Sequence, residues 1–238
     1  MRRSLSITTF VLVFVAGLWL GPGSISAQDT FQTMRQDMVD FQLRGRGIRQ
    51  PLLLDAMATV PRHLFVPQSV RNEAYYDQPL PIGSTGGGIM QPYITALMIE
   101  LLELDGTQKV LEIGTGSGYD AAVLSRLAAQ VFTIEISEEL GRSAQQRLAE
   151  LGFDNVSVRV GDGHEGWPSE APFDAILLTA APEEVPPKLL EQLKTNGRMV
   201  LAVGGFVQNL TAIRKTPQGL LTSRIEPVRI SPMSAEDK

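Results

Sequence analysis

The chain has no cysteine and only two histidines among its 238 residues. It cannot form disulfides, and a chain of this length can fold without them, so the absence is compatible with either an exported or an internal protein. The sequence also lacks the residue spacings typical of zinc sites, phosphate-binding P-loops and serine hydrolases. We therefore expect no metal ion in the functional site and interpret His63 and His164 as structural residues.

The chain also has no excess of basic over acidic residues. Lysine and arginine number 21, aspartate and glutamate 26, and the formal net charge is −5. Binding to a phosphate backbone needs a basic face, so nucleic acid is not expected as a partner. The hydrophobic fraction of 43% and the absence of internal repeats indicate one globular α/β domain with a sizeable core. We expect a monomer, because no apolar stripe is left without a partner inside the chain.

Long hydrophobic runs are confined to the N-terminus. Arg2 and Arg3 precede an apolar centre at residues 10–20, and small residues follow at 24–27. This arrangement predicts a secretory signal peptide over residues 1–27, hence a periplasmic or secreted protein with no membrane contact after cleavage. An uncleaved membrane anchor is the alternative, although the apolar centre is shorter than the about 20 residues that a spanning helix needs.

The most informative stretch is residues 109–137. An apolar run at 110–113 leads into Gly-Thr-Gly-Ser-Gly at 114–118, and apolar residues at helical spacing follow over 119–129. A second apolar run then ends in Glu135. Strand, glycine turn, helix, strand and acid together indicate a nucleotide-binding βαβ unit. Glu135 lies about twenty residues past the turn, where a carboxylate accepts hydrogen bonds from both ribose hydroxyls.

The glycine spacing separates two classes of cofactor. Dinucleotide-binding folds use G-x-G-x-x-G, with the helix N-terminus directed at a pyrophosphate. Here the pattern is G-x-G-x-G, preceded by Glu112. A carboxylate at that position would repel a pyrophosphate but suits a ligand with an ammonium and a sulfonium group. The pattern predicts S-adenosylmethionine, with a ligand-free glycine turn or a nicotinamide dinucleotide site as the alternatives.

Strand-like and helical segments alternate along the rest of the chain. This alternation predicts a Rossmann-like, doubly wound and mostly parallel sheet, with residues 207–214 and 220–230 forming an antiparallel hairpin at one edge. A strand is expected over 198–203 after a turn at Asn196-Gly197. We expect one domain over 28–238, in which residues 28–93 form an N-terminal helical cap and a loop, and residues 94–238 form the core. Prolines predict extended chain over 60–67 within the cap.

Several motifs resemble the protein-L-isoaspartate O-methyltransferase family between residues 31 and 233. They are VPRHLFVP (60–67), PLPIG (79–83), QPY (91–93), VLEIGTGSGY (110–119), GDG (161–163) and APFDAI (171–176). The glycine motif alone would indicate only a class I methyltransferase. VPRHLFVP and PLPIG are far more specific, and they occur in the family's order and spacing.

The resemblance implies a class I S-adenosylmethionine-dependent fold with a seven-stranded sheet. It further implies an enzyme that methylates the side-chain carboxylate of L-isoaspartyl and D-aspartyl residues in damaged proteins or peptides. The ester is then lost to a succinimide, which hydrolyses partly to normal aspartate. A carboxylate is already ionised at neutral pH and needs no general base, so catalysis would consist of positioning and water exclusion.

The resemblance also implies roles for single residues. Cofactor binding is expected at Glu112, Gly114, Gly116, Gly118, Glu135, Asp162 and Gly163. Within this set the glycines would hold the methionine part, Glu135 the ribose and Asp162 the adenine amino group. A turn-capping role is the alternative for Asp162. Substrate binding is expected at Ile89, Met90 and Gln91.

The substrate loop departs from the family pattern. Where the family has threonine and an active-site serine, this chain has Gly88 and Met90. The catalytic residue is therefore unknown, and Ser84 and Thr85 are candidates for a replacement hydroxyl. Reduced repair activity, methylation of a different carboxyl acceptor, and a cofactor-binding protein without turnover are the three interpretations. A cytoplasmic location, which is usual for the family, is the alternative to export.

Overall fold

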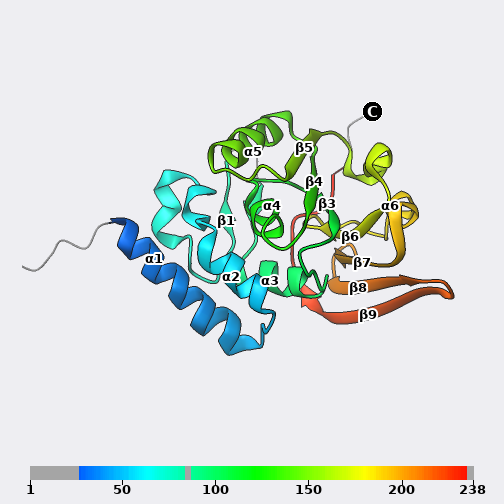
Figure 1. The fold of residues 1–238 in the computed structure, drawn as a ribbon, viewed down its shortest axis with the longest axis horizontal. Helices are drawn as coiled ribbons and strands as arrows, with labels where there is room; N and C mark the ends of the chain where they lie inside the picture. The colour runs from blue at the N-terminus through cyan, green and yellow to red at the C-terminus, as the bar shows by residue number, and fades with distance from the viewer. Residues whose placement is uncertain (1–26, 84–86, 235–238) are drawn as a thin grey trace, which may run out of the picture.

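The computed structural model describes residues 27–83 and 87–234 and is built around one seven-stranded sheet (Figure 1). In spatial order the strands are β5 (Val156–Val160), β4 (Gln130–Glu135), β3 (Lys109–Ile113), β6 (Phe173–Leu178), β7 (Leu193–Val203), β8 (Gln208–Thr216) and β9 (Gly219–Val228). The first five strands are mutually parallel, whereas β8 and β9 pair antiparallel. The predicted doubly wound sheet with an antiparallel edge hairpin is confirmed.

The order of the strands reverses at β3. From β3 the chain moves outward to β4 and β5, and then returns to place β6 on the other side of β3. Ligands of such sheets bind at the carboxyl ends of the strands beside the reversal, because the two flanking loops diverge there and leave a crevice. The topology therefore predicts a site between the loops that follow β3 and β6.

Helices cover both faces of the sheet. They are α1 (Ala27–Asp37), α2 (Pro51–Thr59), α3 (Pro92–Glu100), α4 (Tyr119–Leu124), α5 (Glu138–Glu150) and α6 (Pro187–Gln192). Shorter helical segments are η1 (Met38–Leu43), η2 (Arg44–Arg46), η3 (Arg62–Leu64), η4 (Gln68–Glu73), η5 (Gly163–Glu165) and η6 (Pro168–Glu170). The first helices form the N-terminal cap that the sequence predicted.

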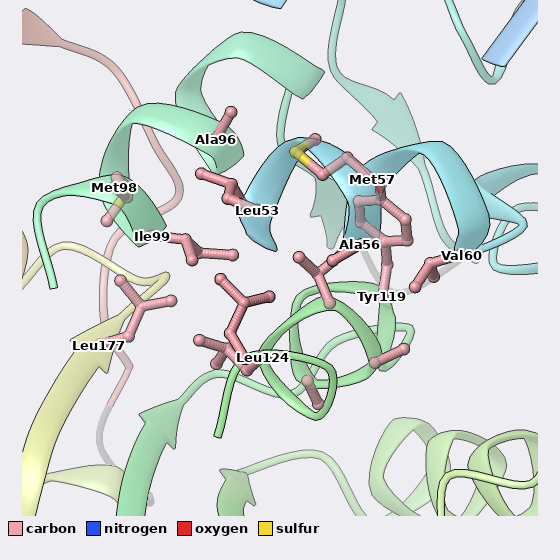
Figure 2. Close-up of a cluster of buried hydrophobic side chains, with 14 of the residues drawn as sticks. Leu53, Ala56, Met57, Val60, Ala96, Met98, Ile99, Tyr119, Leu124 and Leu177 are labelled. Carbon is pink, nitrogen blue, oxygen red and sulfur yellow. The ribbon is translucent and has the colours of Figure 1, made fainter. Parts of the chain in front are cut away.

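The central strands are buried on both faces, as their nearly continuous apolar sequences require. One face, which includes Val110 and Leu177, packs against α2, α3 and α4. Figure 2 shows side chains of these three helices meeting over β6. The other face, which includes Ile113 and Leu178, packs against α6. The cap therefore shares one hydrophobic cluster with the core.

Two local predictions were wrong in detail, and one expected domain boundary lies within a helix. Residues 60–67 are not wholly extended, because η3 occupies Arg62–Leu64; the restriction before a proline acts on Val60 and Val66 and leaves the residues between them free to turn. The Asn196-Gly197 turn lies inside β7, which already begins at Leu193. The expected boundary between cap and core at residue 94 falls inside α3.

The predicted signal peptide lies outside the described residues, apart from Ala27 at the start of α1. Within the described ranges, no helix combines the length and the apolar character that crossing a membrane would require.

The edge hairpin of β8 and β9 projects from the sheet (Figure 1, orange and red). Leu221 and Ile225 on β9, and Phe206 in the turn before β8, are exposed apolar side chains. The sequence argument for a monomer assumed that every apolar stripe had a partner within the chain, and these residues contradict that assumption. The monomeric state stays a prediction that the elution volume of the purified chain in size-exclusion chromatography would test.

Candidate active site

A cavity of about 370 Å³ opens at the carboxyl ends of β3, β4 and β6, where the topology predicts a site. This volume is within the range of small-molecule sites, about 300–1,000 Å³. The lining residues are Ile82, Gly87, Gly88, Ile113, Gly114, Gly116, Ile134, Glu135, Ile136, Ser137, Leu140, Gly163, Thr179, Ala180, Ser231, Pro232, Met233 and Ser234. We call this space the cofactor cavity.

The turn after β3 is held against the turn after β6 by a close backbone approach. Gly114 has a φ of +99°, and a Cβ there would lie 2.5 Å from Thr179 Oγ1. The Thr179 hydroxyl donates to the Gly114 carbonyl oxygen at 2.6 Å. A glycine at this position is therefore required both by the backbone conformation and by the contact.

Glu135 lies at the end of β4 with its carboxylate in the cavity wall. Only 7% of the residue is exposed. Its Oε2 accepts a hydrogen bond from the Gly116 backbone N–H at 2.8 Å, and its Oε1 accepts one from Ser137 N at 3.0 Å. Each carboxylate oxygen has a second lone pair. The carboxylate is therefore held in place with capacity for two further hydrogen bonds, the number that a ribose diol would offer.

Glu112 is not among the lining residues of the cavity, and its expected contact with the cofactor stays a prediction. Successive side chains of a strand point to opposite faces, and on β3 it is Ile113 that faces the cavity. Glu112 is fully buried on the other face, where Thr133 donates to its Oε2 at 2.5 Å. Burial, reinforced by the charges of Asp120 and Glu135, raises its pKa well above the usual range.

Gly114 and Gly116 line the cavity, but Gly118 does not. At Gly118, a Cβ would lie 3.2 Å from Leu148 Cδ1 on α5, so this glycine serves the packing of α4 on α5. Its expected contact with the cofactor stays a prediction.

Gly163 lines the cavity, and a Cβ there would lie 2.3 Å from Ile113 Cγ2. Asp162 is not among the lining residues. Its Oδ1 accepts a hydrogen bond from His164 N at 2.8 Å and lies 2.9 Å from His164 Nδ1. Asp162 thus caps η5, the alternative that the sequence left open. Its contact with an adenine stays a prediction.

A second cleft of about 330 Å³ adjoins the cofactor cavity. Its lining residues are Pro79, Gly88, Ile89, Met90, Gln91, Ile94, Arg229, Ile230, Ser231 and Pro232. The three expected substrate-binding residues are therefore brought together here. The other two loop candidates, Ser84 and Thr85, lie outside the described residues. We call this space the acceptor cleft.

The loop between the two spaces is held in a short antiparallel pair, β1 (Leu80–Pro81) with β2 (Gly88–Ile89). Arg62 joins this loop to the cap through two hydrogen bonds. Its Nη2 donates to the Met90 carbonyl oxygen at 2.5 Å, and its Nε donates to the Ala74 carbonyl oxygen at 2.8 Å. Arg62 is fully buried. The VPRHLFVP motif thus supplies the cation that positions the substrate loop.

Asp77 and Arg46 fix the end of the same loop. Asp77 Oδ1 accepts a hydrogen bond from the Tyr93 backbone N–H at 3.0 Å, and its other oxygen is paired with Arg46. The Arg46 guanidinium lies 3.4 Å from the centre of the Tyr93 ring. Asp77, Arg46 and Tyr93 therefore hold the start of α3 against the cap.

Beneath the loop, Arg62 belongs to a buried polar cluster. Its guanidinium carbon lies 4.8 Å from the centre of the Tyr119 ring, and Asp120 lies next to Tyr119 on α4. Asp120 Oδ1 accepts a hydrogen bond from the Thr95 hydroxyl at 3.1 Å. Burial raises the pKa of Asp120 to about 6, although the Arg62 charge and the Thr95 hydrogen bond oppose the increase.

The raised pKa of Asp120 predicts how one substitution changes the pH dependence of stability. The folded chain binds a proton at Asp120 up to about pH 6, but the unfolded chain only up to its ordinary pKa of 3.8. As pH rises through this window, the folded chain has to ionise Asp120 in a buried site. Its free energy of unfolding therefore decreases. We expect Asp120→Asn to match the parent below pH 4 and to exceed its free energy of unfolding above pH 6 by up to about 3 kcal/mol.

Urea titrations of the two proteins between pH 4 and pH 7 measure this difference. His63, whose pKa is lowered to about 4 mainly by burial, titrates in both proteins and its contribution cancels. A difference in unfolding free energy that stays constant over this range would contradict the prediction.

Sequence reasoning missed the walls of the cavity that come from later segments. Thr179 follows β6, so the rule that ligands bind at strand carboxyl ends could have found it. Ser231 and Met233 reach the cavity through backbone hydrogen bonds with Ala181, 2.8 Å each. These contacts join segments about fifty positions apart, and no local pattern signals them. Across residues 27–83 and 87–234, no cluster of three metal-ligating side chains occurs.

The sequence is similar to those of known proteins over most of its length. A family profile described as protein-L-isoaspartate(D-aspartate) O-methyltransferase (PCMT) matches residues 33–237. A protein-L-isoaspartate O-methyltransferase of Gloeobacter violaceus is 50% identical over 201 residues, 84% of this chain and 98% of that protein. One of Opitutus terrae is 45% identical over 238 residues, 99% of each chain.

Solved structures show the same fold. A protein-L-isoaspartate O-methyltransferase superposes with a TM-score of 0.78 at 28% identity, covering 84% of this chain and 66% of that one. A Plasmodium falciparum protein solved in complex with S-adenosyl-L-homocysteine superposes with a TM-score of 0.73 at 21% identity, covering 84% of this chain and 98% of that one.

Proposed function

Because the chain belongs to the protein-L-isoaspartate (D-aspartate) O-methyltransferase family, we propose that it methylates the side-chain carboxylate of L-isoaspartyl and D-aspartyl residues in damaged proteins. The methyl donor is S-adenosylmethionine. The observation that carries the proposal is the pair of adjoining spaces, a cofactor cavity at the sheet's switch point and an acceptor cleft beside it. The cavity and the cleft share Gly88, Ser231 and Pro232.

The residues of the cofactor cavity fit the methyl donor. Glu135 is oriented to accept hydrogen bonds from a ribose diol. Ile134, Ile136 and Leu140 supply apolar surface beside it for a nucleoside. Bound there, the donor supplies a methyl group that its sulfonium has already activated.

The chain's own part in the reaction is to position the acceptor and exclude water. A carboxylate is ionised at neutral pH, so no general base is required. One carboxylate oxygen forms a bond to the methyl carbon while the carbon–sulfur bond breaks. The electron pair of the broken bond stays on the sulfur. In the repair sequence, the next backbone nitrogen of the substrate then displaces methanol from the ester and closes a succinimide. Such a site therefore accelerates the reaction mainly by aligning the reacting atoms.

A pair of synthetic peptides tests the proposal. The purified chain is incubated with S-adenosylmethionine and either an isoaspartyl peptide or its aspartyl twin, and methyl ester is measured by mass spectrometry and radiolabel transfer. We expect ester on the isoaspartyl peptide alone, because its backbone runs through the β-carbonyl and leaves the α-carboxylate free in a different position from the aspartyl side chain. Equal labelling of both peptides, or of neither, would contradict the proposal.

We also propose that the enzyme works outside the cytoplasm. The support is the N-terminal sequence, in which two arginines, an apolar centre and small residues follow in the order of a signal peptide. Cell fractionation together with the N-terminal mass of the recovered chain tests the proposal. Recovery of the full-length chain in the cytoplasm would overturn it.

A further inference from the structure

We propose that the hydroxyl of Ser231 positions the methyl-accepting carboxylate, the role expected of the family serine where this chain has Met90. This inference rests on the proposed function. A carboxylate must be oriented for in-line attack, and hydrogen-bond donors are the means of orienting it. In this chain, neither Gly88 nor Met90 of the loop has a side-chain donor.

The acceptor oxygen has to lie where the two spaces meet, because it must reach from the acceptor cleft to a methyl group in the cofactor cavity. Among the residues that the structure describes, three line both spaces: Gly88, Ser231 and Pro232. Glycine and proline carry no polar side chain, so Ser231 has the only side-chain donor among the three. Gln91 and Arg229 also carry side-chain donors, but they line only the acceptor cleft and not the cofactor cavity. They are therefore placed for parts of the substrate further from the methyl group.

The backbone on both sides of Ser231 is fixed. The side-chain amide of Gln208 donates to the Ile230 carbonyl oxygen at 3.1 Å and accepts from the Ile230 N–H at 2.8 Å. The Ser231 carbonyl oxygen accepts from Ala181 N at 2.8 Å, and Met233 N donates to the Ala181 carbonyl oxygen at 2.8 Å. A donor held between two such anchors loses little conformational freedom when it binds a ligand.

The hydroxyl itself is available. Ser231 is exposed, and its side chain has no hydrogen-bond partner in the part of the chain that the structure describes. Met90, which lines the acceptor cleft, packs its side chain against the cluster that contains Ile230. The methionine therefore closes the apolar contact between the loop and the C-terminal segment, and the serine next to Ile230 supplies the polar group.

Two substitutions at Ser231 test the inference. We expect Ser231→Ala to lower kcat/KM for an isoaspartyl peptide by about ten- to a hundredfold, the effect of one hydrogen bond to a charged group. The affinity for S-adenosylmethionine, measured by calorimetry, should not change. Ser231→Thr keeps the hydroxyl and should restore most of the activity. Ser223→Ala, at an exposed serine of β9 outside both spaces, is the matched control and should behave as the parent.

The outcomes separate this inference from the proposed function. If the parent methylates the isoaspartyl peptide and Ser231→Ala does so equally well, the role of Ser231 is overturned and the function stands. The role is also overturned if the loss in Ser231→Ala is matched by an equal loss of cofactor affinity, or if threonine does not restore activity in a protein with the parent's thermal stability. If the parent methylates no peptide, both proposals fail.

Discussion

Glu135→Ala should weaken the binding of S-adenosylmethionine by about a hundredfold to ten-thousandfold. Two hydrogen bonds from the ribose hydroxyls to a carboxylate would be lost, and each is worth about 1.5–3 kcal/mol. The substitution also leaves the N–H groups of Gly116 and Ser137 without the carboxylate oxygens that accept from them at 2.8 and 3.0 Å. Isothermal titration with the cofactor measures the change directly.

Glu138→Ala is the matched control for this measurement. Glu138 lies only three residues further along the chain, but its side chain is 67% exposed and pairs with Arg142 on the surface of α5. Its removal should leave cofactor affinity unchanged, because a surface ion pair contributes at most about 1 kcal/mol and only to stability. An affinity of Glu135→Ala that matches that of Glu138→Ala would remove the basis for placing the ribose at the end of β4.

Arg62→Met should lower the free energy of unfolding by about 3–5 kcal/mol. The methionine can fill the volume, but it leaves the carbonyl oxygens of Ala74 and Met90 without their donor. It also removes the positive charge near Asp120. Because the Met90 carbonyl belongs to the substrate loop, we expect kcat/KM for an isoaspartyl peptide to fall as well. Urea denaturation measures the first effect and the peptide assay the second.

Two variants show whether these losses come from the buried contacts of Arg62. Arg62→Lys keeps the charge but cannot donate to two carbonyl groups and stack on Tyr119 at the same time, so we expect an intermediate loss of stability. Arg142→Met removes an arginine whose side chain is 75% exposed and should change stability by less than about 1 kcal/mol. If Arg62→Met were as stable as Arg142→Met, the guanidinium would not be what holds the loop.

Much of the fold was predictable because its signals are local. The apolar run of β3, the glycine turn and the run of β4 ending in Glu135 are consecutive in sequence, and each element is determined by neighbours a few positions away. The carboxyl-end rule then placed Glu135 beside the glycines without knowledge of any distance. The edge hairpin was predictable for the same reason, since its two strands follow one another along the chain.

Local patterns could not predict which side chains of the glycine motif and its neighbours line the cavity. Glu112 precedes the glycine turn, as the cofactor interpretation required, but the pleat of β3 turns Ile113 to the cavity and buries Glu112 behind it. Gly118 belongs to the glycine motif, yet its missing side chain makes room for Leu148 of α5. Proximity in sequence could not separate a residue that faces the ligand from one that faces a helix.

By itself, the sequence determined the family, the methyl donor and the strand that carries Glu135, because these depend on motifs and periodicity within short stretches. Only the tertiary structure decided which groups surround the acceptor. Arg62 reaches Met90 across 28 positions, and Ser231 enters the site through its bond to Ala181. Such contacts form when the cap and the C-terminal segment close over the sheet. Their energy depends on distances that no local pattern encodes.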